Sequence, residues 1–301
     1  MASKLSLFYP APSLNWHLIT MTGPDALDFL HRLTTVNLKE LSPGEGRLGC
    51  FLTPQGKFRA FFTLWYLGPE SFAFEFEGGA DQKWKKELLA TIEQFTFGEK
   101  FILEEKSLSC AWLLGEKAEA KFQTDEIEAG VRVFRHGHQT YSHDWISVWG
   151  EPSALDAWIK QAAPEAKTLT LEALENWRVQ STFPRVDHEI TDAANPLETG
   201  LRDAIAPNKG CYPGQEIIEK IVALGSPARR LVRLDDLGSE PSQGENLYSE
   251  SNEVGKITSA TRATSTISAL AIVKKTVAKE GSVTQLQNGE TAKVSHVTPY
   301  Q

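Results

Sequence analysis

Lys209-Gly210-Cys211-Tyr212-Pro213-Gly214-Gln215-Glu216 holds a thiol, an ammonium group, two glycines and a proline within one short stretch. Apolar residues follow it at helical spacing, at Ile217, Ile221 and Leu224, which predicts a helix beginning near Pro213. Gln215 and Glu216 then lie in the first turn. There the helix dipole favours a carboxylate, and a Gln side chain can reach back to a free backbone N–H. The stretch therefore predicts a shaped loop that leads into a helix.

Two interpretations of Cys211 are open at this point. A nearby ammonium group and a helix N-terminus both favour a thiolate over a thiol, so Lys209 and the predicted helix would make Cys211 reactive. Alternatively, Gly210, Pro213 and Gly214 only shape a tight turn, and the thiol is a small buried apolar group beneath it. The coincidence of lysine, paired glycines and helix start favours the reactive cysteine.

This octapeptide closely resembles the K-G-C-Y-x-G-Q-E signature of the YgfZ-type folate-binding proteins, which are relatives of the glycine-cleavage aminomethyltransferase. Residues 22–30 resemble the family's opening strand and helix, and residues 35–38 resemble its T-N-D-L-like loop. Residues 54–57 resemble its first hairpin turn, and residues 190–201 resemble its I-P-x-x-x-N linker. Gly225 with Arg229-Arg230-Leu231 matches its G-x-x-x-R-R-L exit.

The resemblance implies an α+β, aminomethyltransferase-like fold, with ferredoxin-like halves around a central cavity and a small C-terminal β-barrel. It also implies a folate-dependent role in the assembly or repair of iron–sulfur clusters, with bacterial members acting as tRNA-modification accessory proteins. Cys211 would be the reactive or ligand-donating thiol and Lys209 its charge partner. Tetrahydrofolate or a derivative would be held by Arg178, Gln180, Asn195, Tyr212, Gln215, Glu216, Lys220, Arg229 and Arg230.

Two of these assignments carry alternatives. Arg178 falls on the family's arginine ahead of the cavity loop, where a structural salt bridge and a ligand contact are both open. Basic residues gather around the signature, and we expect some of them to meet the glutamate carboxylates of a folate tail, although most surface charges simply face water. They are Lys209, Lys220, Arg229, Arg230 and Arg233.

The chain departs from the family pattern at three places. Arg59 and Ala60 stand where the aminomethyltransferases carry an Asp-Asp pair with a catalytic carboxylate, so glycine-cleavage chemistry is not expected. Gln180 replaces the Glu of an R-x-E-A-G run, which removes an ionic contact to the pterin. Glu219-Lys220 replaces an Ala-Arg pair, and Lys220 keeps the charge without the planar fork of arginine.

Composition narrows the class of protein. The 301 residues carry a net charge of −8, which opposes a general affinity for nucleic acid, so we expect no direct contact with tRNA. Cys50, Cys110 and Cys211 are far apart, which argues against a disulfide framework and against a metal or cluster held by the chain itself. Neither a signal-peptide pattern nor a membrane span is recognisable, so we expect a cytoplasmic protein that meets reduced folate and iron–sulfur client or assembly proteins.

The hydrophobic pattern alternates helices with hairpins, which is typical of an α+β fold rather than a doubly wound sheet. It predicts a strand at 14–21, a helix from residue 23, three strands between 47 and 77, and helices around Trp84 to Ile92, at 153–163 and at 170–181. Beyond Gly225, short apolar strands between Gly, Ser and Asn clusters suit a small barrel. We therefore expect a folate-binding region at 1–225 and a barrel domain at 226–301.

The sequence contains two weaker patterns. His136-Gly137-His138 with His143 and Asp144 offers imidazoles to a metal, but a polar hairpin tip is the favoured interpretation. Trp145, Trp149, Trp158 and Trp177 are candidates for stacking on a pterin, and core packing is favoured for each.

Three functions remain open from the sequence. The first is a folate-dependent accessory protein for iron–sulfur enzymes that acts through Cys211. The second is a tetrahydrofolate-dependent one-carbon transferase, and the third is a non-catalytic interaction module in which the signature is a structural turn.

Overall fold

The computed structural model describes residues 5–9, 14–115, 127–128, 130–136, 144–263 and 266–299. The chain forms two compact units, each built from several segments. Unit 1 comprises Met1–Phe51, Arg59–Thr170 and Asp203–Pro213, and unit 2 comprises Leu52–Phe58, Leu171–Arg202 and Gly214–Gln301. The expected division of the chain into a folate-binding region and a barrel domain at residue 225 stays a prediction.

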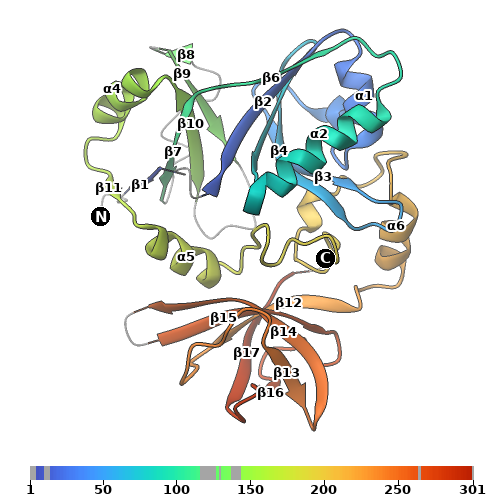
Figure 1. The fold of residues 1–301 in the computed structure, drawn as a ribbon, viewed down its shortest axis with the longest axis vertical. Helices are drawn as coiled ribbons and strands as arrows, with labels where there is room; N and C mark the ends of the chain where they lie inside the picture. Colours follow the sequence, from blue (N-terminus) through green and yellow to red (C-terminus); the bar gives the residue numbers. More distant parts are fainter. Residues whose placement is uncertain are drawn as a thin grey trace. The chain divides into compact units, whose positions relative to one another are not determined.

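A five-stranded sheet covered by two helices forms the first half of unit 1 (Figure 1). Phe72, Phe74 and Phe76 alternate along one strand and pack under the helices, whose Leu30 and Leu88 are fully buried. The strand order is β3 (Gly46–Leu52), β4 (Phe58–Gly68), β5 (Ser71–Glu77), β2 (Trp16–Thr22) and β6 (Ile102–Glu105), and the helices are α1 (Ala26–Leu33) and α2 (Lys83–Phe95), with short 3-10 turns at Leu38–Glu40 and Ala80–Gln82.

A six-stranded sheet forms the second half of unit 1. One helix, α4 (Pro152–Ala162), packs Leu155, Trp158 and Ile159 against it. The strand order is β11 (Lys167–Thr168), β1 (Ser6–Phe8), β7 (Ser109–Leu114), β10 (Trp145–Gly150), β9 (Val131–Arg135) and β8 (Ile127–Glu128).

A buried carboxylate joins the two sheets of unit 1. Glu75 points away from the helices, because it alternates with the three phenylalanines of β5. Its oxygens accept hydrogen bonds from the indole N–H groups of Trp16 at 2.9 Å, Trp65 at 3.0 Å and Trp149 at 3.0 Å. The Nε2 atom of His136 lies 3.4 Å from the same carboxylate. Burial opposes the charge of Glu75, but His136 and the donors outweigh burial and lower the pKa of this carboxyl.

Unit 2 contains a closed barrel of six strands. Helix α5 (Leu171–Gln180) packs on it, with Val179 buried against Leu231 and Leu270. Helix α6 (Gln215–Ala223) also belongs to this unit. The strand order is β12 (Arg229–Asp235), β15 (Thr266–Lys274), β14 (Asn252–Ala263), β13 (Asn246–Ser249), β16 (Val283–Gln285) and β17 (Thr291–Val297).

The predicted α+β class and the C-terminal barrel are confirmed, and the predicted helices and strands agree with the observed elements to within a few residues. The long segment from 183 to 208 is irregular, as expected, apart from a 3-10 turn at Arg202–Ala204. In the described part of the chain, no helix combines the length and the apolar composition that a membrane crossing needs.

The apolar spacing of α6 predicts the helix but not the buried side chain. The helix begins at Gln215, two residues later than expected, and only Ile218 is buried within it. Leu224 lies beyond the last helical residue and is 71% exposed.

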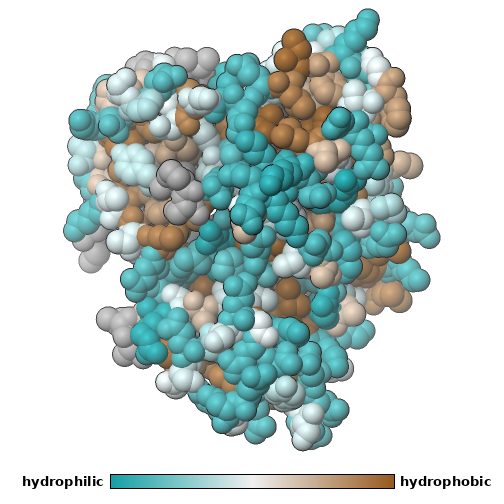
Figure 2. Space-filling view, viewed as in Figure 1, coloured by the Kyte–Doolittle hydropathy of each residue, from teal (hydrophilic) through white to brown (hydrophobic). Residues whose placement is uncertain are grey.

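Hydrophilic side chains cover most of the face seen in Figure 2, with separate apolar patches between them.

We predict that Glu75→Gln destabilises the protein. The amide keeps the shape of the side chain but removes the charge that the three indole donors and His136 satisfy, so buried donors lose their acceptor. The free energy of unfolding should fall by about 3 kcal/mol, in the range measured for a broken buried charge pair. Guanidinium denaturation followed by tryptophan fluorescence measures it. Glu93→Gln, at an exposed position of α2, is the matched control and should leave the midpoint unchanged.

Candidate functional site

The signature begins in a loop that a buried threonine anchors inside unit 1. The Oγ1 atom of Thr35 donates to the Ala204 carbonyl at 2.5 Å, and the Thr35 carbonyl accepts from the Ala206 N–H at 3.0 Å. The same hydroxyl accepts from the Cys50 N–H at 2.9 Å, which ties the loop to strand β3. Thr35 is fully buried. Its segment matched the family pattern in the sequence, but that pattern did not indicate this anchoring role.

The ammonium group of Lys209 docks at the C-terminal end of helix α1. Its Nζ atom donates to the carbonyl of His31, one of the last carbonyls of the helix, and lies 5.4 Å from the ring centroid of Tyr212. A helix C-terminus and an aromatic face both attract a cation, which explains how a lysine only 7% exposed is accommodated. Burial lowers the pKa of Lys209 to about 8, Cys211 opposes that change, and Lys39 adds to it.

Cys211 is the accessible thiol of the chain. It is exposed, whereas Cys50 and Cys110 are buried. Burial raises the pKa of both buried thiols, and for Cys110 the charge of Glu75 adds to the rise. A buried thiol with a raised pKa forms little thiolate near neutral pH, so chemistry with an external partner falls to Cys211.

Gly214 fits the turn into α6 for two reasons. Its φ of 82° lies in the left-handed region, and a Cβ atom there would stand 2.5 Å from the carbonyl oxygen of Thr53. The Nε2 atom of Gln215 donates to Glu219 at 2.5 Å, and the predicted contact of its side-chain oxygen with a free backbone N–H stays a prediction. Glu216 lies exposed in the first turn of α6, as predicted from the helix dipole.

Arg178 is the centre of a buried charge network in unit 2. Its five N–H donors make five hydrogen bonds between 2.7 and 3.0 Å, two to Glu175 and one each to Glu189, Ser259 and the Phe183 carbonyl. No donor remains for a ligand in this arrangement. The geometry therefore favours the structural alternative for Arg178, and its predicted contact with folate does not fit the residue as it lies here.

Gln180 ends helix α5 beside the barrel. Its Nε2 atom donates to Ser268 at 2.8 Å, and its backbone carbonyl accepts from Arg233. Asn195 is buried and accepts from the N–H groups of Leu197 and Glu198 at 3.0 and 3.1 Å, which fixes a turn within the linker-like segment 190–201. Both side chains thus have local partners, and their contact with folate stays a prediction.

The predicted basic cluster is largely paired within the protein. Arg229 holds both carboxylate oxygens of Glu198, at 3.0 and 3.1 Å. Arg233 pairs with Asp235 at 3.0 Å, and Arg230 donates to the Thr298 carbonyl. Lys220 is exposed on α6. Pairing lowers the net positive charge that these residues can offer to a folate tail, so that role rests on Lys220 and stays a prediction.

The positions of the missing carboxylates are part of the packing of unit 1. Ala60 is 1% exposed within the core of the five-stranded sheet. Arg59 donates to Gln94 at 2.7 Å and lies 3.6 Å from Glu87, both on helix α2. No carboxylate replaces the family's acid at these two positions.

The two weaker sequence patterns have different outcomes. His136 is buried and bound to Ser147 at 3.0 Å, while His138 and His143 lie outside the described residues. Among the residues described, no group of three or more His, Cys, Asp or Glu side chains is arranged to hold a metal ion. Trp145, Trp149 and Trp158 are buried, in agreement with the core interpretation, and Trp177 is half-buried.

We predict that Gly214→Ala costs more stability than Gly225→Ala. Both glycines have nearly the same positive φ, 82° and 79°, but a Cβ atom at Gly225 would meet nothing within 4 Å. The control should lose about 1 kcal/mol from backbone strain alone, and Gly214→Ala should lose that plus the cost of the clash with Thr53. Urea denaturation of both variants measures the difference, and equal losses would contradict the close approach.

We predict that Lys209 titrates near pH 8, well below an exposed lysine. NMR of 13C-dimethylated lysines would follow it, with Lys209→Arg identifying the resonance. In Cys211→Ala the pKa of Lys209 should fall further, because the negative charge of the thiolate that raises this pKa is lost. An unchanged pKa in that variant would show that Lys209 and Cys211 are not electrostatically coupled.

Comparisons with known proteins agree with this fold. No protein-family model matches the chain. A chloroplastic protein of Arabidopsis thaliana, named as a candidate transferase, is 25% identical over 275 residues, which cover 81% of this chain. The chain spans 59% of the length of that plant relative. The tRNA-modifying protein YgfZ of Yersinia pestis is 26% identical over 248 residues, which cover 77% of this chain and 73% of the relative.

The fold has a close counterpart among solved structures. The crystal structure of the glycine cleavage system aminomethyltransferase T from Bartonella henselae superimposes with a TM-score of 0.80 over 99% of this chain and 86% of that protein, at 19% identity. That likeness concerns the fold alone. The resemblance of this chain to the YgfZ-type relatives of aminomethyltransferase is therefore confirmed, by the bacterial and plant sequences and by the shared fold.

Proposed function

We propose that the protein is a YgfZ-type accessory protein that supports iron–sulfur cluster assembly or repair in cluster-dependent enzymes, including those that modify tRNA. Cys211 is its reactive or ligand-donating thiol, and reduced folate is its proposed ligand. The observation that carries the proposal is the loop that leaves Cys211 exposed beside the docked ammonium of Lys209. The names of the bacterial relatives support the connection to tRNA modification.

Lys209 has a defined task in this proposal. Near neutral pH, below its pKa of about 8, it carries a positive charge close to Cys211. The His31 carbonyl and the Tyr212 ring hold that charge in place. A thiolate in this position can attack an electrophilic partner or donate to iron, and the coupling to folate is left to experiment because Arg178 offers no free donor.

A one-carbon transferase that uses tetrahydrofolate is the second candidate. The name of the plant relative favours it, and the aminomethyltransferase fold is compatible with it. Arg59 and Ala60 weigh against it, because the family's carboxylate is absent at both positions.

The deciding experiment is an anaerobic calorimetric titration with tetrahydrofolate and its formyl and methyl derivatives, on the wild-type protein and on Cys211→Ala. Binding by both proteins would support a folate site separate from the thiol. Absence of binding to every form would remove folate from the proposal. Cys211→Ser is then tested for the activity of a cluster-dependent tRNA-modifying enzyme in cells. Lost activity with an unchanged melting temperature supports the accessory role, and unaltered activity would leave a structural turn as the better interpretation.

We also predict selective alkylation. The native protein should take up one equivalent of iodoacetamide, Cys211→Ser none, and the unfolded wild-type protein three, since its sequence holds three cysteines. At pH 7 Lys209→Met should slow the native reaction severalfold, whereas Lys209→Arg should slow it less because the charge remains. Equal alkylation rates in the wild-type, Lys209→Met and Lys209→Arg proteins would show that Lys209 does not assist the thiol.

A further inference from the structure

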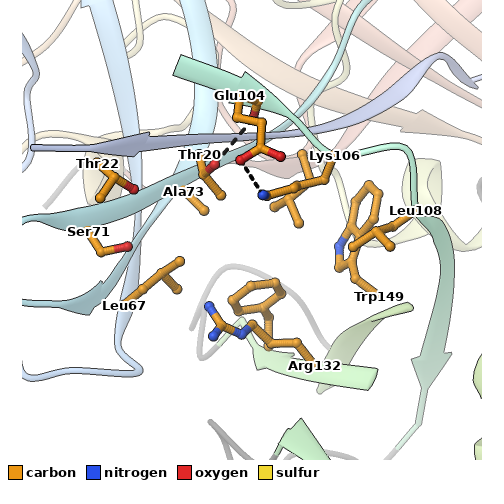
Figure 3. A pocket seen from close by; sticks show the side chains of 12 residues that line it. Thr20, Thr22, Leu67, Ser71, Ala73, Glu104, Lys106, Leu108, Arg132 and Trp149 are labelled. Atoms are coloured by element: carbon orange, nitrogen blue, oxygen red, sulfur yellow. Dashed lines mark hydrogen bonds and ion pairs between the residues drawn. The ribbon is translucent and has the colours of Figure 1, made fainter. Parts of the chain in front are cut away.

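A cavity of about 290 Å³ lies between the two sheets of unit 1, and no residue of the signature lines it (Figure 3). Strands β2 and β5 contribute to one wall, and strand β9 contributes to the opposite wall. Phe134 and Trp149 are only 1% and 2% exposed, so they belong to the packing behind the cavity and present no ring to a ligand. The accessible lining consists of hydroxyl, charged and leucine side chains. Sites for small molecules usually measure about 300 to 1,000 Å³, so this volume suits a small ligand.

Two hydroxyl groups lie side by side on the wall that the five-stranded sheet provides. Thr22 of β2 and Ser71 of β5 are directly opposite each other in the strand register, which puts their side chains on the same face of the sheet. Figure 3 shows both hydroxyls turned toward the same space. Neither side chain makes a hydrogen bond with any part of the chain that the structure describes, so each has a donor to offer.

The guanidinium group of Arg132 reaches into the cavity from the opposite wall (Figure 3). Arg132 lies on β9, is half-buried, and makes neither an ion pair nor a side-chain hydrogen bond with the residues described. The other two charged residues of the lining, Glu104 and Lys106, pair with each other at 2.5 Å and cancel in charge. The lining therefore keeps one uncompensated positive charge, which favours a ligand with a single negative charge.

The number of donors indicates a carboxylate. A carboxylate has about four lone-pair sites on its two oxygens, and a guanidinium group can occupy two of them in bidentate fashion. The hydroxyls of Thr22 and Ser71 can occupy the other two. A phosphate dianion would bring a second negative charge that the described lining does not balance. Leu67 and Leu108 are half-buried and supply aliphatic surface for the rest of the ligand.

We propose that this cavity binds a small aliphatic monocarboxylate. The carboxylate lies between Arg132 on one wall and the hydroxyls of Thr22 and Ser71 on the other. The alkyl chain lies along Leu67 and Leu108, where its burial adds a hydrophobic contribution to binding. The inference goes beyond the proposed function, since it depends neither on the signature loop nor on folate.

The probe is hexanoate, with the neutral hexanamide as its matched ligand control and inorganic phosphate as the dianionic comparison. An NMR titration of the wild-type protein should show tighter binding of hexanoate than of either comparison ligand. Arg132→Met should weaken hexanoate binding by about tenfold to a hundredfold, as expected for a lost hydrogen-bonded ion pair, and leave the amide unaffected. Arg47→Met, at an exposed arginine of β3, should change neither.

Two further variants test the hydroxyls while Arg132 is retained. Ser71→Ala and Thr22→Val should each weaken hexanoate binding by about tenfold, because each removes one hydrogen bond to a charged group. Melting curves establish that every variant is folded, and the hydroxyl variants decide the matter should Arg132→Met fail to fold. Hexanoate binding no tighter than that of hexanamide, tighter binding of phosphate, or undiminished hexanoate binding in folded Arg132→Met would overturn the proposal.

Discussion

The docking of the Lys209 ammonium on the end of helix α1 is the contact on which the candidate site depends. A buried lysine needs compensation for lost hydration, and the His31 carbonyl and the Tyr212 ring supply it. Because that carbonyl belongs to the last turn of α1, the position of the loop is set by the helix that the five-stranded sheet carries. Thr35 fixes the same loop from a second side. Cys211 can thus be exposed without being loosely placed.

Each unit also contains a charged group inside its core. Glu75 gathers three indole N–H groups and a histidine in unit 1, and Arg178 gathers two carboxylates, a hydroxyl and a carbonyl in unit 2. Such networks are costly when one member is removed, because the remaining polar groups stay buried. They also fix side-chain orientation. Glu75 accepts from the indole N–H of Trp149 and so fixes the orientation of that ring.

Local patterns in the sequence predict the helices and strands better than they predict which side chains contact one another. The alternation of Phe72, Phe74 and Phe76 and the spacing of Trp84, Leu88 and Ile92 are determined by neighbouring positions, so a sequence read alone is sufficient for them. The contacts of Glu75 join residues far apart in the chain, and no periodicity indicates them. Arg178 was recognised as a special position, but only its surroundings distinguish a structural arginine from one that binds a ligand. Cys211 could be predicted as the reactive residue because the lysine, glycines and helix start around it lie within one short stretch, and its role stays a prediction.

The departures at Arg59 and Ala60 bear on which residue carries the chemistry. A carboxylate at residue 60 would lie among the phenylalanines of the sheet, where burying an unpaired charge costs several kcal/mol. A carboxylate at residue 59 would lose the contacts that Arg59 makes with α2. Restoring the family's carboxylate at either position would therefore also require changes in the surrounding side chains. A loop that retains Lys209, Cys211 and Tyr212 on such a frame leaves the thiol as its reactive group, and this favours the accessory role over one-carbon transfer.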